Sequence, residues 1–97
     1  MIALDTRCKR SDSIVHRRIG TEAVLVPIRG DVADLESIYT LNGVGQRVWE
    51  LLDGEKTVAA IREAIVQEFD VDADTAGKDL LEFLKELLAV KAIELQD

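Results

Sequence analysis

Hydrophobic and polar positions alternate in the first half of this chain and recur every three or four residues in the second half. Ile14 to Ile19 and Ala23 to Ile28 are rich in aliphatic and β-branched side chains, and Glu36 to Leu41 alternates polar with apolar positions. Such patterns predict β-strands, and Pro27, which has no amide proton, favours an edge or a strand end. We therefore expect a three-stranded antiparallel sheet before residue 42.

Three helices are predicted to follow this sheet. Their N-caps are expected at Asn42, at Thr57 and at either Asp72 or Asp74, because these side chains can accept from the free amides of a first turn. Gly54 is expected to end the first helix. The helices would cover residues 43–53, 58–69 and up to about 89, with a weak strand after them. The order of elements predicts an α+β fold that resembles a winged helix-turn-helix.

Ninety-seven residues are enough for one domain with one modest core. The predicted division is an irregular N-terminal segment, residues 1–13, followed by a folded domain, residues 14–97. The single cysteine, Cys8, cannot form an internal disulfide, which fits a reducing compartment. No apolar run is long enough for a signal peptide or a membrane span, so we expect a cytoplasmic protein that does not contact a membrane.

Charge separates the two parts of the chain. The formal net charge is −7, yet residues 1–29 carry six basic and three acidic side chains, whereas residues 30–97 carry six basic and sixteen acidic ones. The predicted third helix, which would enter the DNA groove in a winged-helix regulator, is itself acidic. Because neutralisation of phosphates supplies much of DNA affinity, we do not expect nucleic-acid binding.

Residues for catalysis or for binding a metal or cofactor are not found in a convincing arrangement. His16 is the only histidine, and Cys8 has no paired base. Asp70, Asp72 and Asp74 resemble the start of a calcium loop, but the later positions of that pattern do not match. We therefore predict a protein that is not an enzyme and carries no cofactor.

The class of function that remains is binding of a peptide or protein. A free edge of the third predicted strand could accept an extended chain by backbone pairing, with Ile38 or Tyr39 and the wide apolar face of the third helix lining a groove. Periodicity alone slightly favours a second interpretation, in which that wide face only packs against the other helices and the sheet. The same free edge would permit pairing between two copies, giving a homodimer.

Three segments resemble the PqqD family, named after pyrroloquinoline quinone synthesis protein D, over about residues 14–95. They are LNGVGQRVWELLDG at Leu41 to Gly54, the following EKTVAAIREAI, and DLLEFLKELLAVKAIEL near the C-terminus. The resemblance implies a peptide chaperone, or recognition element, for ribosomally synthesised and modified peptides, with a winged-helix fold that does not bind DNA. Its partners would be the leader of a precursor peptide and a modifying enzyme, often a radical S-adenosylmethionine (radical SAM) enzyme.

The resemblance also implies where the leader binds, as an added strand on the third strand with the third helix as the opposite wall. The implied peptide-binding residues are Ser37, Ile38, Tyr39, Thr40, Leu41, Lys78, Leu81, Leu84, Lys85 and Leu88. The RGDVADLES stretch and Val48-Trp49 depart from the members that act in quinone synthesis, so the chain is more similar to the broader family. The alternative functions are a divergent winged-helix transcription regulator and a dimerisation module.

Overall fold

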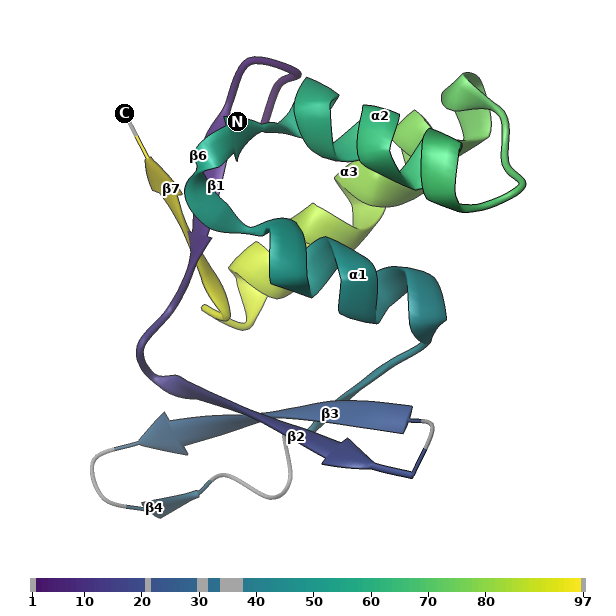
Figure 1. The fold of residues 1–97 in the computed structure, drawn as a ribbon. Helices are drawn as coiled ribbons and strands as arrows, with labels where there is room; N and C mark the ends of the chain where they lie inside the picture. Colours follow the sequence, from purple (N-terminus) through teal and green to yellow (C-terminus); the bar gives the residue numbers. More distant parts are fainter. Residues whose placement is uncertain (1, 21, 30–31, 34–37, 97) are drawn as a thin grey trace.

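The computed structural model describes residues 2–20, 22–29, 32–33 and 38–96. Three helices and a small sheet form one layer, and a second sheet lies below them as a wing (Figure 1). The helices are α1 (Gly43–Leu51), α2 (Val58–Glu68) and α3 (Ala73–Ala89). The strands are β1 (Arg7–Arg10), β2 (Ile14–Ile19), β3 (Glu22–Arg29), β4 (Val32–Ala33), β5 (Tyr39–Leu41), β6 (Asp53–Thr57) and β7 (Ile93–Gln96).

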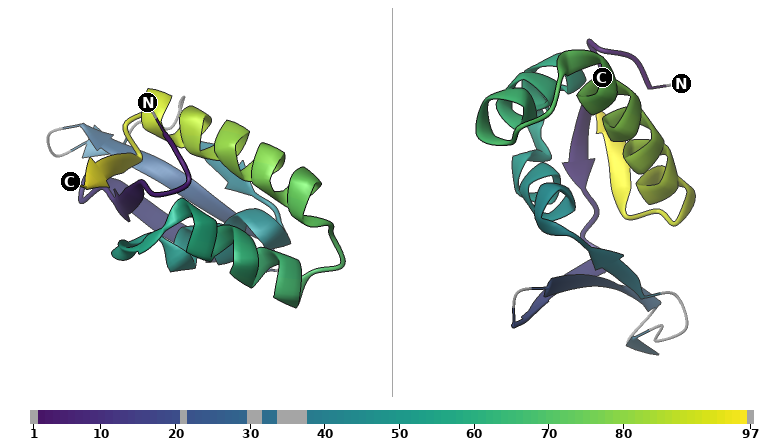
Figure 2. Two further views of the ribbon diagram at one scale, coloured as in Figure 1. Left: turned by 90° about the horizontal axis from the view of Figure 1, so that it is seen from above. Right: turned by 90° about the vertical axis from the view of Figure 1, so that its right-hand side faces the viewer.

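The wing confirms the predicted antiparallel sheet. Strand β3 is central, with β2 on one side and both β4 and β5 pairing with it as well. Figure 2 shows this sheet as a separate layer when the molecule is turned about the vertical axis. The third predicted strand began at Glu36, whereas β5 begins at Tyr39, and residues 36 and 37 lie outside the described part of the chain. The α+β, winged-helix class is confirmed.

The helix N-caps lie where the sequence placed them. The Asn42 side chain accepts from the Gly45 amide at 2.7 Å, Thr57 from the Ala60 amide at 3.1 Å, and Asp72, rather than Asp74, from the Thr75 amide at 2.8 Å. Each cap satisfies an amide that has no partner inside its helix. These local bonds fix the start of all three helices.

The prediction of an irregular chain before residue 14 is wrong for part of the N-terminal segment. Arg7–Arg10 form β1, which lies between β6 and β7 in a second antiparallel sheet. The stretch is polar in sequence because only Cys8 points inward, where its side chain is 1% exposed. Its strand conformation is stabilised by backbone pairing on both sides, and periodicity does not report such pairing.

Gly54 has a different role from the predicted helix stop. Helix α1 already ends at Leu51, and Gly54 lies in β6 with φ at +83°. An added Cβ at this position would lie 3.2 Å from the Cβ of Lys9 on the neighbouring β1. Glycine is therefore needed here for backbone conformation and for the close approach of two strands.

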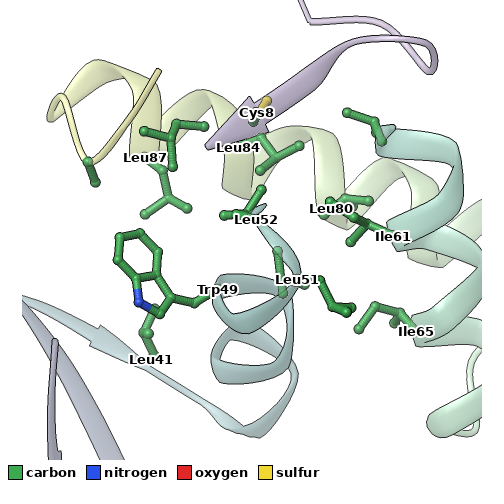
Figure 3. Close-up of a cluster of buried hydrophobic side chains, with 14 of the residues drawn as sticks. Cys8, Leu41, Trp49, Leu51, Leu52, Ile61, Ile65, Leu80, Leu84 and Leu87 are labelled. Carbon is green, nitrogen blue, oxygen red and sulfur yellow. The ribbon is translucent and has the colours of Figure 1, made fainter. Parts of the chain in front are cut away.

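The core lies between the three helices, the β6-β1-β7 sheet and the wing, and it includes the side chains labelled in Figure 3. Trp49, the only tryptophan of the sequence, is 5% exposed and stacks on the imidazole of His16 with ring centroids 6.4 Å apart. Leu84 is fully buried and points toward Leu52 in the interior. Among the described residues, none of the helices is long and apolar enough to cross a membrane.

Candidate peptide-binding groove between β5 and α3

The backbone of β5 has one edge paired and one edge turned outward. The Ile28 amide donates to the carbonyl of Ser13, the residue just before β2, at 2.7 Å. Because the backbone N–H and C=O groups of successive strand residues point to opposite edges, the even-numbered residues of β3 direct these groups toward β2. By strand alternation, Ala23 and Leu25 direct theirs toward β5, opposite Leu41 and Tyr39.

Thr40 is opposite Val24 and therefore belongs to the pair that does not exchange hydrogen bonds within the sheet. Its N–H and C=O point away from β3. Within the described ranges, β5 pairs only with β3, so this outer edge is available to another strand.

Pro27 lies in β3 between the residues that pair with β5 and those that pair with β4. By the same alternation, its backbone faces the β4 and β5 side, where it has no N–H to donate. In the described part of the chain, β4 pairs with Ile28 and Arg29, and β5 pairs with residues 23–25.

Tyr39 connects β5 to α3. Its ring is tilted against Phe83, with centroids 5.9 Å apart, and its hydroxyl donates to the carboxylate of Glu86. Burial of the phenol, and then the hydrogen bond and negative charge of Glu86, raise the pKa of Tyr39 to about 12. Because strand side chains alternate, Leu41 faces the helices with Tyr39, whereas the exposed Thr40 points to the other face.

A pocket of about 620 Å³ opens between β5 and α3, and it is called here the β5–α3 pocket. Its walls come from β5 and from all three helices, so the strand edge and the pocket form one continuous surface. The lining residues are Tyr39, Thr40, Leu41, Asn42, Val44, Gly45, Val48, Ile65, Phe69, Asp70, Val71, Ala76, Asp79, Leu80, Glu82, Phe83 and Glu86. This volume is within the range of cavities that bind small ligands, and it is large enough for peptide side chains.

The charge of the β5–α3 pocket has one sign. Its acidic side chains are Asp70, Asp79, Glu82 and Glu86, and lysine and arginine are absent from its described lining. The remaining lining is mostly apolar. The pocket therefore combines an apolar floor with an acidic rim.

The structure places the predicted β5 residues at this surface. Tyr39, Thr40 and Leu41 line the β5–α3 pocket, and Ile38 lies just before them with its side chain 44% exposed. Ser37 lies outside the described residues. The sequence interpretation left open whether Ile38 or Tyr39 faces the helix, and the contacts with Phe83 and Glu86 identify Tyr39.

The predicted α3 residues lie elsewhere on the helix. Leu84 belongs to the core, and Leu81 and Leu88 are partly buried against that core. Lys78 and Lys85 are exposed, about 100° around the helix from Asp79 and Glu86. None of these five residues lines the β5–α3 pocket.

Four other α3 residues, which were not predicted from the sequence, line the β5–α3 pocket instead. They are Asp79, Glu82, Phe83 and Glu86. One of them could have been predicted from the sequence. The positions of α3 that face the core are Ala76, Leu80, Leu84 and Leu87, so the aromatic side chain of Phe83 is not needed for the core-facing stripe and could serve a binding surface. The rotation of α3 about its axis, however, is set by tertiary packing.

Metal-binding clusters are not found in the described residues. Histidine, cysteine and carboxylate side chains do not gather in threes there at metal-binding distance. Cys8 is buried, and burial raises the pKa of its thiol, which keeps it protonated. His16 stacks on Trp49 and lies outside the β5–α3 pocket.

Comparison with known proteins agrees with this fold. The family described as "Coenzyme PQQ synthesis protein D (PqqD)" matches residues 22–93. A solved structure entitled "TbiB1 in Complex with the TbiA(beta) Leader Peptide" shares 34% sequence identity with a TM-score of 0.72, covering 89% of this chain and 94% of that chain. Curated proteins gave no match. The chain therefore belongs to the PqqD family.

Proposed function

We propose that this protein is a non-enzymatic recognition element that binds the leader of a ribosomally synthesised precursor peptide and presents it to a modifying enzyme, such as a radical SAM enzyme. The proposal is supported by membership of the PqqD family and by the likeness to a protein solved with a leader peptide. The observation that carries it is the outward-facing backbone of Thr40 at the margin of the β5–α3 pocket.

The outer edge of β5 and the β5–α3 pocket would contribute to binding in different ways. A leader strand beside β5 would exchange backbone hydrogen bonds with Thr40, and these hydrogen bonds do not depend on the sequence of the leader. Alternate side chains of that strand would point toward α3 and enter the β5–α3 pocket, where Phe83 and the apolar floor select them. Strand addition thus gives affinity, and the pocket gives specificity.

The charges of α3 argue against the alternative function, a winged-helix transcription regulator that binds DNA. Asp74, Asp79, Glu82 and Glu86 are exposed on this helix, and a phosphate backbone would meet them as like charges. The dimerisation alternative uses the same free edge as the leader and is tested by the same variants.

The test compares three proline variants. Thr40→Pro removes an amide that faces outward, so it should fold normally and bind more weakly, by about 5- to 10-fold for one lost backbone hydrogen bond plus the clash of the ring. Tyr39→Pro removes an amide that faces β3, so it should destabilise the wing itself. Arg18→Pro is the matched control, because its amide points outward from β2 at the opposite edge of the sheet.

Binding is measured by titrating ¹⁵N-labelled protein with synthetic leaders of short precursor peptides encoded beside its gene. Shifts are expected at Ile38 to Leu41, Phe83 and Glu86. Equal affinity of folded Thr40→Pro and wild type would refute strand addition at β5. Failure of every such leader to bind would overturn the proposed function.

A further inference from the structure

The acidic rim of the β5–α3 pocket has a spacing that matches an added strand. Asp79, Glu82 and Glu86 lie at helical positions i, i+3 and i+7, so they form one row on the side of α3 that lines the pocket. This row spans about 10 Å, since α3 rises about 1.5 Å per residue. Three residues of extended chain cover nearly the same length. Side chains two residues apart in a bound strand could therefore each reach a carboxylate.

These carboxylates have no basic partner within the described part of the chain. The ion pairs found there join Lys9 to Glu94, Lys56 to Asp53, and Arg47 to both Glu50 and Glu68, and none of these residues lines the β5–α3 pocket. Glu86 accepts from the hydroxyl of Tyr39, which is neutral and leaves the negative charge in place. The rim thus holds several like charges that a cation from outside can compensate.

The floor beside this rim is suited to apolar side chains. Leu80 and Phe83 contribute to it from α3, and Phe69 and Val71 from the connection between α2 and α3. A lysine or arginine side chain also has an apolar stem, which can lie along Tyr39 and Phe83 while its charged end reaches Glu82 or Glu86. One pocket can therefore accept an apolar anchor and a neighbouring cationic one.

We infer that the β5–α3 pocket selects leader segments that carry a lysine or arginine two residues from an aromatic or aliphatic side chain. This inference rests on the proposed function and specifies the chemistry of the leader. It reverses the preference that contacts with Lys78 and Lys85 would impose, because those lysines would favour an acidic leader.

The experiment selects binders from a displayed library of random 12-residue peptides, using wild-type protein as bait. Enrichment of lysine or arginine at a fixed spacing from an apolar residue is expected. One enriched peptide is then measured with its cationic residue changed to glutamine and to glutamate. Because each partly exposed ion pair contributes modestly, a loss of about 3- to 5-fold is expected for glutamine and a larger loss for glutamate.

Protein variants assign the effect to the rim. Asp79→Asn with Glu82→Gln should weaken the enriched peptide by about 5- to 10-fold at low salt and less at high salt. The matched control, Glu55→Gln with Glu63→Gln, makes the same change of net charge at two exposed residues outside the β5–α3 pocket and should leave affinity unchanged. Glu82→Lys should bind the glutamate form of the peptide better than the lysine form.

The outcomes separate this inference from the proposed function. Enriched peptides that shift the Thr40 amide without any preference for cations overturn the inference and leave the proposed function standing. Absence of enriched peptides, or peptides that leave Thr40 unshifted, overturns both. Self-association that the Asp79→Asn, Glu82→Gln variant abolishes, without any enriched peptide, would assign the pocket to a second copy of the chain and also overturns both.

Discussion

Leu84 gives the clearest test of how α3 is rotated in the fold. The sequence placed Leu84 among the peptide contacts, whereas the structure places it in the core with its side chain 0% exposed. Leu84→Ala removes three carbon atoms, which is roughly 2.4 kcal/mol of transfer free energy. The remaining cavity raises the expected loss of unfolding free energy to about 3 to 4 kcal/mol.

The assay is thermal and urea unfolding followed by circular dichroism. For a domain of this size the expected loss corresponds to a fall in melting temperature of roughly 12 to 30 °C. Leu81→Ala is the matched control, because it makes the same chemical change on the same helix at a partly buried position and should cost less than half as much. Affinity for peptide, measured well below the transition, should change little in Leu84→Ala.

The opposite result would refute this placement of Leu84. A Leu84→Ala protein within about 1 kcal/mol of the wild type would show that the side chain is not in a packed interior. Loss of peptide affinity in that stable variant would restore the sequence-based prediction of a direct contact.

Three other predictions follow from the packing and the electrostatics. Trp49→Ala should lower the unfolding free energy by about 3 to 5 kcal/mol in urea titrations, because the indole is buried. Gly54→Ala should lower it by about 1 to 2 kcal/mol because of the positive φ, whereas the control Gly43→Ala, which meets no neighbour, should be neutral or stabilising. The absorbance of the only tyrosine should titrate near pH 12, and in Glu86→Gln at a lower pH that remains above 10 because burial is the largest cause.

The pH dependence of stability has a definite sign for Tyr39. Its pKa in the folded protein is about 12, above the ordinary value of 10.0, so folding favours the protonated phenol. The resulting stabilisation is fully present below pH 10 and is lost as pH rises from 10 to 12. Over that interval the urea midpoint of wild type should fall more than that of Tyr39→Phe. Equal slopes for the two proteins would contradict the contact with Glu86.

Sequence predicted those features that depend on neighbours along the chain. The caps act on amides three residues away, so residue type and position were sufficient to predict Asn42 and Thr57 and to reduce the third cap to Asp72 or Asp74. The aliphatic pattern of β3 and the apolar stripe of the helices likewise predicted the winged-helix class.

Features that depend on distant parts of the chain were missed. The β6-β1-β7 sheet joins Arg7 to Thr57 and to Gln96, which come from the middle and the end of the sequence. The side of α3 that lines the groove is set by the contact of Tyr39 with Phe83, which periodicity within α3 cannot reveal. Its wide apolar face belongs mainly to the core, as the second sequence interpretation held.

Amide hydrogen exchange at Thr40 tests the central claim most directly. Exchange at Thr40 and Tyr39 is compared by NMR in free protein and at saturation with a bound leader. Tyr39 should be protected in both states, because its amide faces β3, whereas Thr40 should exchange at least about 10-fold more slowly only in the complex. Unchanged exchange at Thr40 under saturating leader would contradict strand addition to β5.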